Sequence, residues 1–288
     1  MSINICLLGL SGSGKTCYLY VMSYLLTKGI PINGHRISAT SMNRQQQLKL
    51  YHGIEQMAAG IWPDGSVDTI TYPFELKIDG QSVGDFKVYD YRGGALDGMS
   101  DCDVDDSEEL FDTFTHSGCI IFLVDGDTLL EALDQQNLEL NHRNITFQSQ
   151  LKARNRINYI ESLMNECSRR LNREVPSLLV ITKKDILSDK ELAAGHKLLK
   201  ELLPTLFSGH NDMVVGITAV TLGENLHNDH GRLTGGTLCL NTDGNVHIPV
   251  LFALFQDLDE CPIDIDNAEL FPSDRISFYK GGQEALIL

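Results

Sequence analysis

The sequence predicts an α/β protein in which helices cover both faces of a mainly parallel sheet. Two observations lead to this prediction. Short runs of almost entirely apolar residues, typical of strands buried on both faces, recur along the chain. Segments with apolar residues at helical spacing lie between these runs, and such alternation is typical of a parallel sheet with helical crossovers.

The first third of the chain opens with an apolar run that ends in glycine-rich sequence, as a buried strand does before a tight turn. A helix and further strands follow from the periodicity of the apolar residues. The elements expected here, in order, are a strand at 3–8, a helix at 14–27, a helix at 41–59 and strands at 69–78 and 84–89.

The rest of the chain continues the alternation. The elements expected here are a short helix at 107–115, a strand at 119–125, an amphipathic helical stretch at 147–172, a strand at 177–182, a helix at 192–203, a strand at 213–218 and an apolar helix at 249–258. We therefore expect one domain over residues 1–260. It carries a helical insertion at about 33–62 and a loop or hairpin insertion at about 223–247, and residues 261–288 form a tail without a clear period.

The composition is acidic and excludes several function classes. Asp and Glu number 39 against 23 Lys and Arg, which gives a formal charge of −16. A general nucleic-acid binder needs a basic footprint, and so does docking on an anionic membrane. No apolar run approaches the roughly 20 residues of a membrane span, no signal peptide is recognisable, and the seven cysteines contain no Cys-x-x-Cys pair. We expect a cytoplasmic protein that holds any anionic ligand by a local device.

Such a device stands at residues 9–16, where GLSGSGKT matches the pattern GxxxxGK[ST] between a strand and a helix. The glycines let consecutive backbone N–H groups converge on a β-phosphate at the positive end of the helix. Lys15 can bridge the β- and γ-phosphates, and the Thr16 hydroxyl can coordinate Mg²⁺. This P-loop predicts a three-layer P-loop NTPase fold. The expected phosphate-binding residues are Ser11, Gly12, Ser13, Gly14, Lys15, Thr16 and Cys17.

A second motif, DYRG, follows the strand-like run at 84–89. Asp90 is a strand-terminal carboxylate that can hold Mg²⁺ through a water, and the Gly93 N–H can sense a γ-phosphate. A threonine upstream is expected to close on the metal. Thr69 and Thr71 both stand at a plausible place, and we favour Thr69 because Thr71 belongs to the strand.

Two further motifs follow later strands. In TKKD, which ends the strand at 177–182, the Asp185 carboxylate can accept both N–H groups of a guanine edge, and Lys183 can lie along the base plane. In the ITAV sequence after the strand at 213–218, a backbone N–H can reach the guanine oxygen. The residues expected around the base are Thr182, Lys183, Asp185, Thr218, Ala219 and Val220.

With these motifs in this order, the sequence resembles the Ras-like GTPases of the translation-factor-related P-loop class, and it looks closer to divergent bacterial members than to vesicle-traffic GTPases. The resemblance implies GTP and GDP binding, Mg²⁺, GTP hydrolysis, and two loops that order around the γ-phosphate. It also implies a protein effector or activating partner. Because acidic residues gather at 101–109, in the second of these loops, we expect that partner to have a basic surface.

The sequence departs from the family pattern at two positions. Thr182 stands where Asn is usual, and Gly94 stands where a water-orienting Gln is usual, so hydrolysis without a partner is expected to be slow. Arg92 is the nearest candidate for an arginine that stabilises transition-state charge, Arg36 and Arg44 lie in the insertion, and a partner's arginine is an equal alternative.

Three functions remain open at this point. The first is a GTP-hydrolysing switch, in which Lys15, Gly93 and Thr69 assist attack of water on the γ-phosphate. The second is a nucleotide-gated interaction module with negligible hydrolysis, motivated by Gly94. The third is an ATPase or small-molecule kinase in which TKKD occurs by chance.

Overall fold

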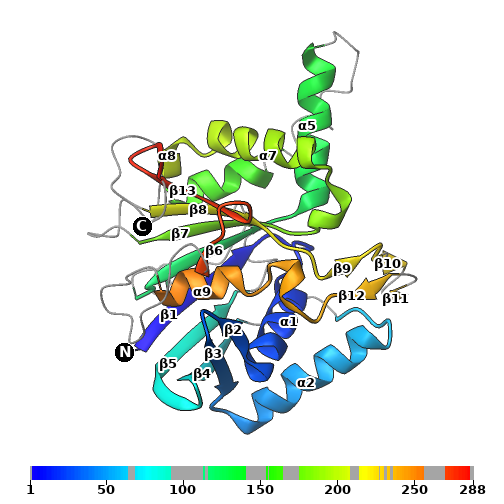
Figure 1. Cartoon of the computed structure of the whole chain (residues 1–288). Coiled ribbons are helices and arrows are strands. Elements are labelled where there is room, and N and C mark those ends of the chain that lie inside the picture. The colour runs from blue at the N-terminus through cyan, green and yellow to red at the C-terminus, as the bar shows by residue number, and fades with distance from the viewer. Residues whose placement is uncertain are drawn as a thin grey trace.

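A computed structural model gives the fold of the chain. It describes residues 2–63, 69–91, 113, 116–140, 154, 156–164, 175–207, 214–226, 228–229, 232–233, 236–255 and 270–285. The described residues form one ten-stranded sheet between two layers of helices (Figure 1). The α/β prediction is confirmed.

The sheet is parallel in its centre and antiparallel at both edges, with the strand order β14-β13-β8-β7-β6-β1-β5-β4-β3-β2. The five neighbouring strands from β8 to β5 run parallel, whereas all other pairs are antiparallel. The strands are β1 (Ser2–Gly9), β2 (Ile30–Ile32), β3 (His35–Ser41), β4 (Ile70–Ile78), β5 (Gln81–Asp90), β6 (Cys119–Val124), β7 (Ser177–Ile181), β8 (Val214–Ala219), β13 (Ile276–Lys280) and β14 (Gln283–Ala285).

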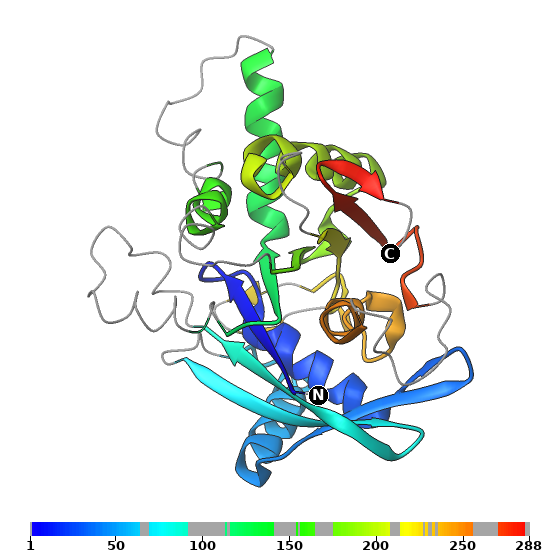
Figure 2. The same ribbon diagram turned by 90° about the vertical axis from the view of Figure 1, so that its left-hand side faces the viewer.

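Alternation along the central strands builds a separate core on each face of the sheet. In β1, Ile5 and Leu7 pack with the helices α1 (Lys15–Lys28), α2 (Arg44–Ala58) and α9 (Ile248–Phe255). The intervening Cys6 and Leu8 face the other core. That core contains α5 (Gly126–Leu140), a helix over residues 156–164, and α7 (Asp189–Leu202), and Figure 2 shows the two helical layers on either side of the sheet.

Side chains define where two of the helices begin. The Asn43 side chain accepts hydrogen bonds from the N–H groups of Gln45 and Gln46, so α2 begins at Arg44 and not at residue 41 as expected. Ser188 and Glu191 form a capping box at the start of α7. Behind α7 follows the short helix α8 (Pro204–Phe207).

Several elements differ from the sequence prediction. Residues 33–62 contain β3 as well as a helix, because residues 35–41 pair with β2 and β4. Helix α5 was not anticipated, and the described part of the tail supplies β13 and β14. The expected helix at 107–115 lies almost wholly outside the described residues, and of the stretch 147–172 only residues 154 and 156–164 are described, as helix.

The segment 223–247 forms two small hairpins, in agreement with one of its two expected forms. β9 (Gly223–Glu224) pairs with β12 (Thr237–Leu238), and between them β10 (Asn228–Asp229) pairs with β11 (Arg232–Leu233). A short 3-10 helix, η2 (Thr242–Gly244), leads from this segment toward α9.

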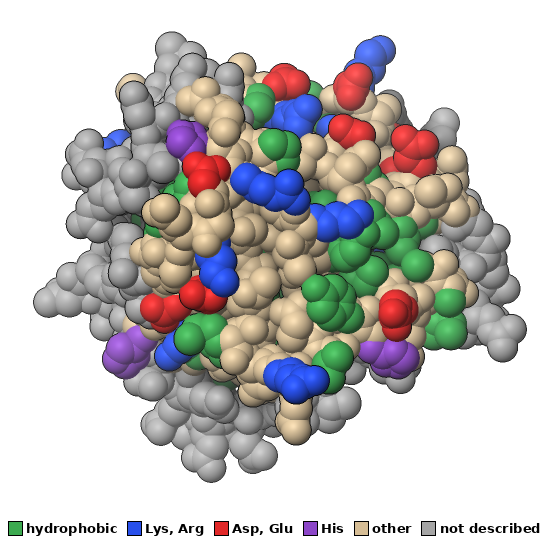
Figure 3. All heavy atoms as spheres, turned by 60° about the horizontal axis from the view of Figure 1, so that its bottom comes forward, with side chains coloured by type: hydrophobic (Ala, Val, Ile, Leu, Met, Phe, Trp, Pro, Cys, Tyr) green, Lys and Arg blue, Asp and Glu red, His purple; other side chains and the backbone are tan. Residues whose placement is uncertain are grey.

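The underside of the molecule, turned forward in Figure 3, carries hydrophobic side chains beside basic ones. The exposed large apolar residues on and around α2 are Met42, Leu48, Tyr51 and Ile61. None of the described helices has both the length and the apolar character needed to cross a membrane.

Candidate functional site

The carboxyl ends of the parallel strands gather the predicted motifs at one edge of the sheet. The P-loop follows β1, Asp90 ends β5, Asp125 follows β6, and Thr182 follows β7. In open α/β sheets, ligands bind outside this edge. The motifs expected from sequence are therefore brought together, except for the residues that lie outside the described parts, Arg92, Gly93 and Gly94.

The P-loop turns through backbone conformations that favour glycine. Gly12 and Gly14 have φ of +82° and +85°, and the Ser13 N–H donates to the Leu10 carbonyl at 3.1 Å. A Cβ on Gly9 would lie 3.0 Å from the Leu123 carbonyl oxygen and closer still to the Ser13 hydroxyl. The loop therefore depends on glycine for both its turns and its contact with β6.

Helix α1 begins directly after the loop, so the N–H groups of its first turn, which have no partner inside the helix, face the loop. Cys17 lies in this turn, and burial raises the pKa of its thiol to about 12, so the thiol stays neutral. The thiol therefore offers no negative charge that would repel a phosphate.

Lys15 is the cation of the loop. Its side chain is buried, and the Nζ donates to the Gly9 carbonyl and to the Leu10 carbonyl, the latter at 3.2 Å. These two contacts hold the ammonium against the backbone of the loop. This is the arrangement that a phosphate-binding lysine requires.

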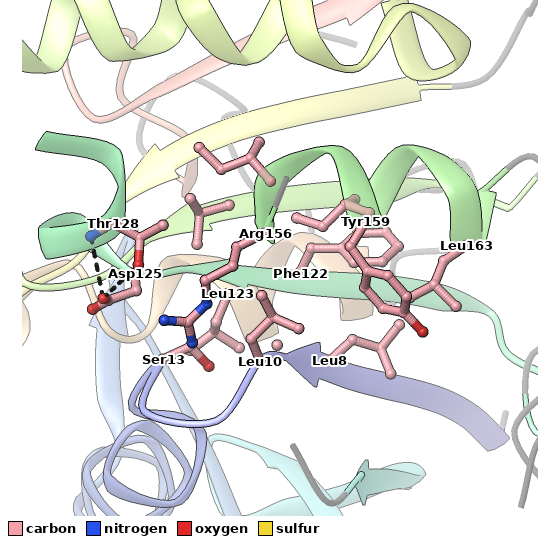
Figure 4. Close-up of a pocket in the computed structure, with 14 residues that line it drawn as sticks. Leu8, Leu10, Ser13, Phe122, Leu123, Asp125, Thr128, Arg156, Tyr159 and Leu163 are labelled. Atoms are coloured by element: carbon pink, nitrogen blue, oxygen red, sulfur yellow. Dashed lines mark hydrogen bonds between the residues drawn. The ribbon is translucent and has the colours of Figure 1, made fainter. Parts of the chain in front are cut away.

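A second cation reaches the P-loop from an element that the sequence analysis did not connect with it. The Arg156 Nη2 donates to the Ser11 carbonyl at 2.9 Å, across 145 positions of sequence. Figure 4 shows the guanidinium above Ser13, in a pocket whose lining also includes Asp125 and Thr128. No sequence motif marks this arginine, because the residues around it show only the apolar spacing of a helix.

The residues expected to hold Mg²⁺ offer suitable chemistry. The Thr16 hydroxyl and the Asp90 carboxylate are hard oxygen donors, and Asp90 is buried at 1% exposure beside Leu7 of the P-loop strand. Burial, with a smaller effect of the Asp90 charge, raises the pKa of Tyr72. Among the described residues, no group of three or more His, Cys, Asp or Glu could hold a metal by itself, so phosphate oxygens would have to complete this site.

Thr69 and Thr71 differ in their relation to Asp90. Ile70 is the register partner of Asp90, and Thr69 directly precedes it, outside β4. Thr71 pairs with Tyr89, and its carbonyl accepts a hydrogen bond from Gln46 Nε2 at 2.7 Å. This geometry supports the choice of Thr69.

Lys183 is fixed by two carboxylates that the sequence analysis did not assign to the site. Its backbone has φ of +54°, and its Nζ forms ion pairs with Asp127 and, at 2.7 Å, with Asp125. Partial burial lowers the pKa of Lys183, but the hydrogen bonds and charges of the two carboxylates outweigh it and the net shift is upward. Lys183 is therefore a charged and anchored side chain.

Asp185 lies in the 3-10 helix η1 (Lys184–Ile186) with its carboxylate exposed at the sheet edge. The Thr221 hydroxyl donates to its Oδ1 at 2.8 Å. Thr221 thus orients the carboxylate. It lies 36 positions after Asp185, and no sequence motif distinguishes it from other loop threonines.

Two groups of the fourth motif form hydrogen bonds within the sheet or to the residue before β13. The Val220 N–H donates to the Ile181 carbonyl at 2.8 Å, and the Thr218 hydroxyl donates to the Arg275 carbonyl at 2.7 Å. Ala219 is the register partner of Ile181 in the parallel ladder. The Val220 N–H and the Thr218 hydroxyl are therefore engaged, and a role of the Ala219 N–H at the guanine oxygen stays a prediction.

The arginines expected from the insertion lie elsewhere. The Arg36 guanidinium donates to the carbonyl of Lys28 at the end of α1, about 20 Å along this helix from the P-loop. Arg44 is the first residue of α2 and is exposed.

No protein-family model matches the sequence, and comparison with curated proteins gives no match either. Solved structures with a similar fold include a bacterial selenocysteine-specific elongation factor, EF-Sec, with 12% identity and a TM-score of 0.43 over 92% of this chain. They also include the elongation factor SelB of Methanococcus maripaludis in complex with the GTP analogue GppNHp, with 13% identity and a TM-score of 0.36 over 76% of the chain. The chain spans only 29% of the length of either elongation factor.

A third similar structure is the signal recognition particle receptor SRb-GTP/SRX complex from Chaetomium thermophilum. It has 14% identity and a TM-score of 0.42, and the match covers 80% of this chain and 93% of that one. At these identities and TM-scores the similarities do not support a conclusion about function. A function can therefore be inferred only from the geometry of the site.

Proposed function

We propose that this protein is a GTP-binding switch that hydrolyses GTP slowly when no partner is bound. One observation carries the proposal: the P-loop with Lys15 and the oriented carboxylate of Asp185 stand at the same edge of the sheet, after β1 and β7. Only β6 lies between these strands, so they are about 10 Å apart. A nucleoside triphosphate spans a comparable distance between its phosphates and its base.

The two ends of the nucleotide would be bound by different chemistry. Backbone N–H groups of residues 11–17 and the Lys15 ammonium would hold the phosphates. At the other end, Asp185 would accept the paired N–H groups of guanine, whereas adenine presents no such pair. The anchored Lys183 would lie along the base, beside Thr182.

Magnesium would be held by Thr16 and Asp90, with Thr69 joining in the triphosphate state, and when bound it would neutralise charge on the phosphates. The Gly93 N–H would sense the γ-phosphate. Gly94 in place of a glutamine leaves the attacking water without a side chain to orient it, so we propose slow intrinsic turnover. The same residue favours the second candidate function, a nucleotide-gated module with negligible hydrolysis.

A switch protein also needs a partner that distinguishes its nucleotide-bound states. We propose a protein effector or activating partner with a basic surface, attracted by the acidic residues at 101–109, and we place the protein in the cytoplasm. This part of the proposal depends on charge alone.

Nucleotide competition tests the proposal. The affinities of GTP, GDP, ATP and xanthosine triphosphate are measured by calorimetry in Mg²⁺ buffer, for the wild type and for Asp185→Asn. We expect GTP and GDP to bind at least 100-fold more tightly than ATP, because a mismatched base leaves polar groups of the site unpaired. Asp185→Asn is expected to lower the affinity for GTP and to raise the affinity for xanthosine triphosphate.

Comparable affinities for ATP and GTP, unchanged in Asp185→Asn, would overturn the guanine assignment and favour an ATPase or kinase. Phosphate release then separates the two remaining functions. Steady release that Lys15→Ala abolishes supports the hydrolysing switch, and tight GTP binding without any release supports the gated module.

A further inference from the structure

The Arg156 guanidinium occupies a place beside the P-loop that needs an explanation. Its helix, residues 156–164, is anchored by Ile157, Ile160 and Leu163, which are buried in the core next to β6. From this fixed base the side chain reaches the Ser11 carbonyl at 2.9 Å (Figure 4). A side chain presented by a packed helix is positioned more firmly than one on a loop.

The contact lies at the end of the loop that a γ-phosphate would approach. Lys15 Nζ, the group that bridges β- and γ-phosphates in P-loop proteins, lies against the Gly9 and Leu10 carbonyls, and Ser11 is the next residue. The α1 N-terminus, where a β-phosphate sits, is at the other end of the loop. Arg156 and Lys15 thus contact adjacent residues of the loop's first half.

The charge of Arg156 is available to an anion. Within the described part of the chain, no carboxylate lies within ion-pair distance of its guanidinium, and its hydrogen-bond partner there is the neutral Ser11 carbonyl. The nearest carboxylate in the same pocket, Asp125, is used otherwise: its Oδ1 pairs with Lys183 and its Oδ2 accepts from Thr128. Among the residues that the structure describes, Arg156 is thus not committed to an ion pair.

We propose that Arg156 is a built-in catalytic arginine that contacts the γ-phosphate when GTP is hydrolysed. This inference rests on the proposed GTPase function and adds the source of the arginine to it. The water oxygen bonds to the γ-phosphorus as the bond from that phosphorus to the bridging oxygen breaks, and GDP leaves with the electron pair. The protons of the water end on the released phosphate and in solvent. Arg156 stays protonated and donates hydrogen bonds to oxygens that gain negative charge.

The test compares single-turnover hydrolysis of GTP by the wild type, Arg156→Ala, Arg156→Lys and the matched control Arg154→Ala, all as full chains with Mg²⁺. Residues 154 and 156 point about 200° apart on a helix, so the control removes the same side chain from another face. We expect a loss of about 100-fold or more in the rate for Arg156→Ala, an intermediate loss for Arg156→Lys, and little change for Arg154→Ala. The GDP affinity of all variants should stay within about threefold, because the contact belongs to the transition state.

A second measurement separates catalysis from folding. GDP with aluminium fluoride imitates the transferring phosphoryl group, and we expect the wild type to form this complex without any partner while Arg156→Ala does not. Guanidinium ions added to Arg156→Ala should restore part of the rate, which a purely structural role of Arg156 would not produce. Equal melting temperatures with bound GDP would confirm that the variants are folded.

The outcomes distinguish this inference from the proposed function. If the wild type does not bind GTP, the proposed function fails and the inference fails with it. If the wild type hydrolyses GTP and Arg156→Ala does so at the same rate, only the arginine assignment is overturned. If the wild type binds GTP tightly but hydrolyses none, the gated module replaces the hydrolysing switch, and the arginine assignment is overturned as well.

Discussion

At the scale of single residues, the hydrogen bond from Thr221 to Asp185 is the contact that most directly sets base recognition in the proposed site. The Thr221 hydroxyl oxygen lies 2.8 Å from one carboxylate oxygen of Asp185, and the carboxylate remains exposed. Removing a hydrogen bond of this kind costs about 1 kcal/mol, which corresponds to about a fivefold change in affinity.

Thr221→Ala is therefore expected to weaken GDP binding about fivefold, and more if the freed carboxylate turns away from the base. Thr221→Ser, which keeps the hydroxyl, serves as the control and should bind GDP as the wild type does. Calorimetric titration measures both. Equal affinities for all three proteins would show that Asp185 needs no orienting partner.

His247 predicts a pH dependence of stability. Burial, and to a lesser degree the charge of Arg275, lowers the pKa of this imidazole to about 4, from about 6.5 in an unfolded chain. Above pH 6.5 the residue is neutral in both states. Between pH 6.5 and 4 only the unfolded state takes up a proton, so the free energy of unfolding falls as the pH falls, by at most about 3 kcal/mol.

Urea unfolding at pH 7 and pH 5 tests this prediction. His247→Gln should lose less stability between these values than the wild type. His52→Gln, at an exposed position of α2, provides the control and should keep the wild-type difference. The prediction is wrong if His247→Gln and the wild type lose the same amount.

At the scale of elements, α2 shows how one helix divides its side chains between core and solvent. Leu50 is 1% exposed and packs against α1, whereas Leu48, two positions away, is 61% exposed. These two leucines form a matched pair, because the substitution is the same and only the burial differs.

Leu50→Ala is expected to lower the free energy of unfolding by about 2–5 kcal/mol, since it leaves a cavity in the core. Leu48→Ala should change it by less than about 0.5 kcal/mol. Denaturant titration of both variants is the measurement. Similar losses for both would mean that the exposed face of α2 is covered, for instance by a second molecule, in solution.

At the scale of the whole molecule, the described part of the tail is built into the sheet. β13 pairs with β8 over five residues, and Phe278 at 3% exposure stacks on Phe252 of α9 with ring centroids 5.9 Å apart. The tail thus closes the core on the face that also holds α1. Because β13 covers the edge of the parallel strands, it also protects β8 from pairing with other chains.

Phe278→Ala is therefore expected to destabilise the protein by about 3–5 kcal/mol. Ser277→Ala, the neighbour on the opposite face of the strand, should have a small effect. Thermal unfolding, followed by circular dichroism, compares the two. An unchanged melting temperature for Phe278→Ala would show that the tail is not part of the cooperative fold.

Much of the fold followed from local patterns. The P-loop, the buried central strands and most of helix α7 were predictable because each depends on residues close in sequence: glycines at fixed spacing, apolar runs, and apolar residues at helical spacing. The expected start of α7 at residue 192 was three residues late, because the capping box was not used. Strand β3 was mistaken for part of a helical insertion, because its partners in β4 lie 33 to 41 positions away in sequence and leave no local sign. The tail strands escaped prediction for the same reason.

In the site, the sequence by itself determined the loop proposed for the phosphates and the carboxylate proposed for the base, because both are short motifs whose backbone conformation is local. Only the tertiary structure decided which distant side chains contact this loop and this carboxylate. The order of the strands places Asp125 beside Lys183, Thr221 beside Asp185 and Arg156 beside Ser11. Such contacts join segments that are far apart in the chain, so the sequence of one segment does not indicate its partner. Only the packing of the sheet and its helices brings the two segments within hydrogen-bond distance.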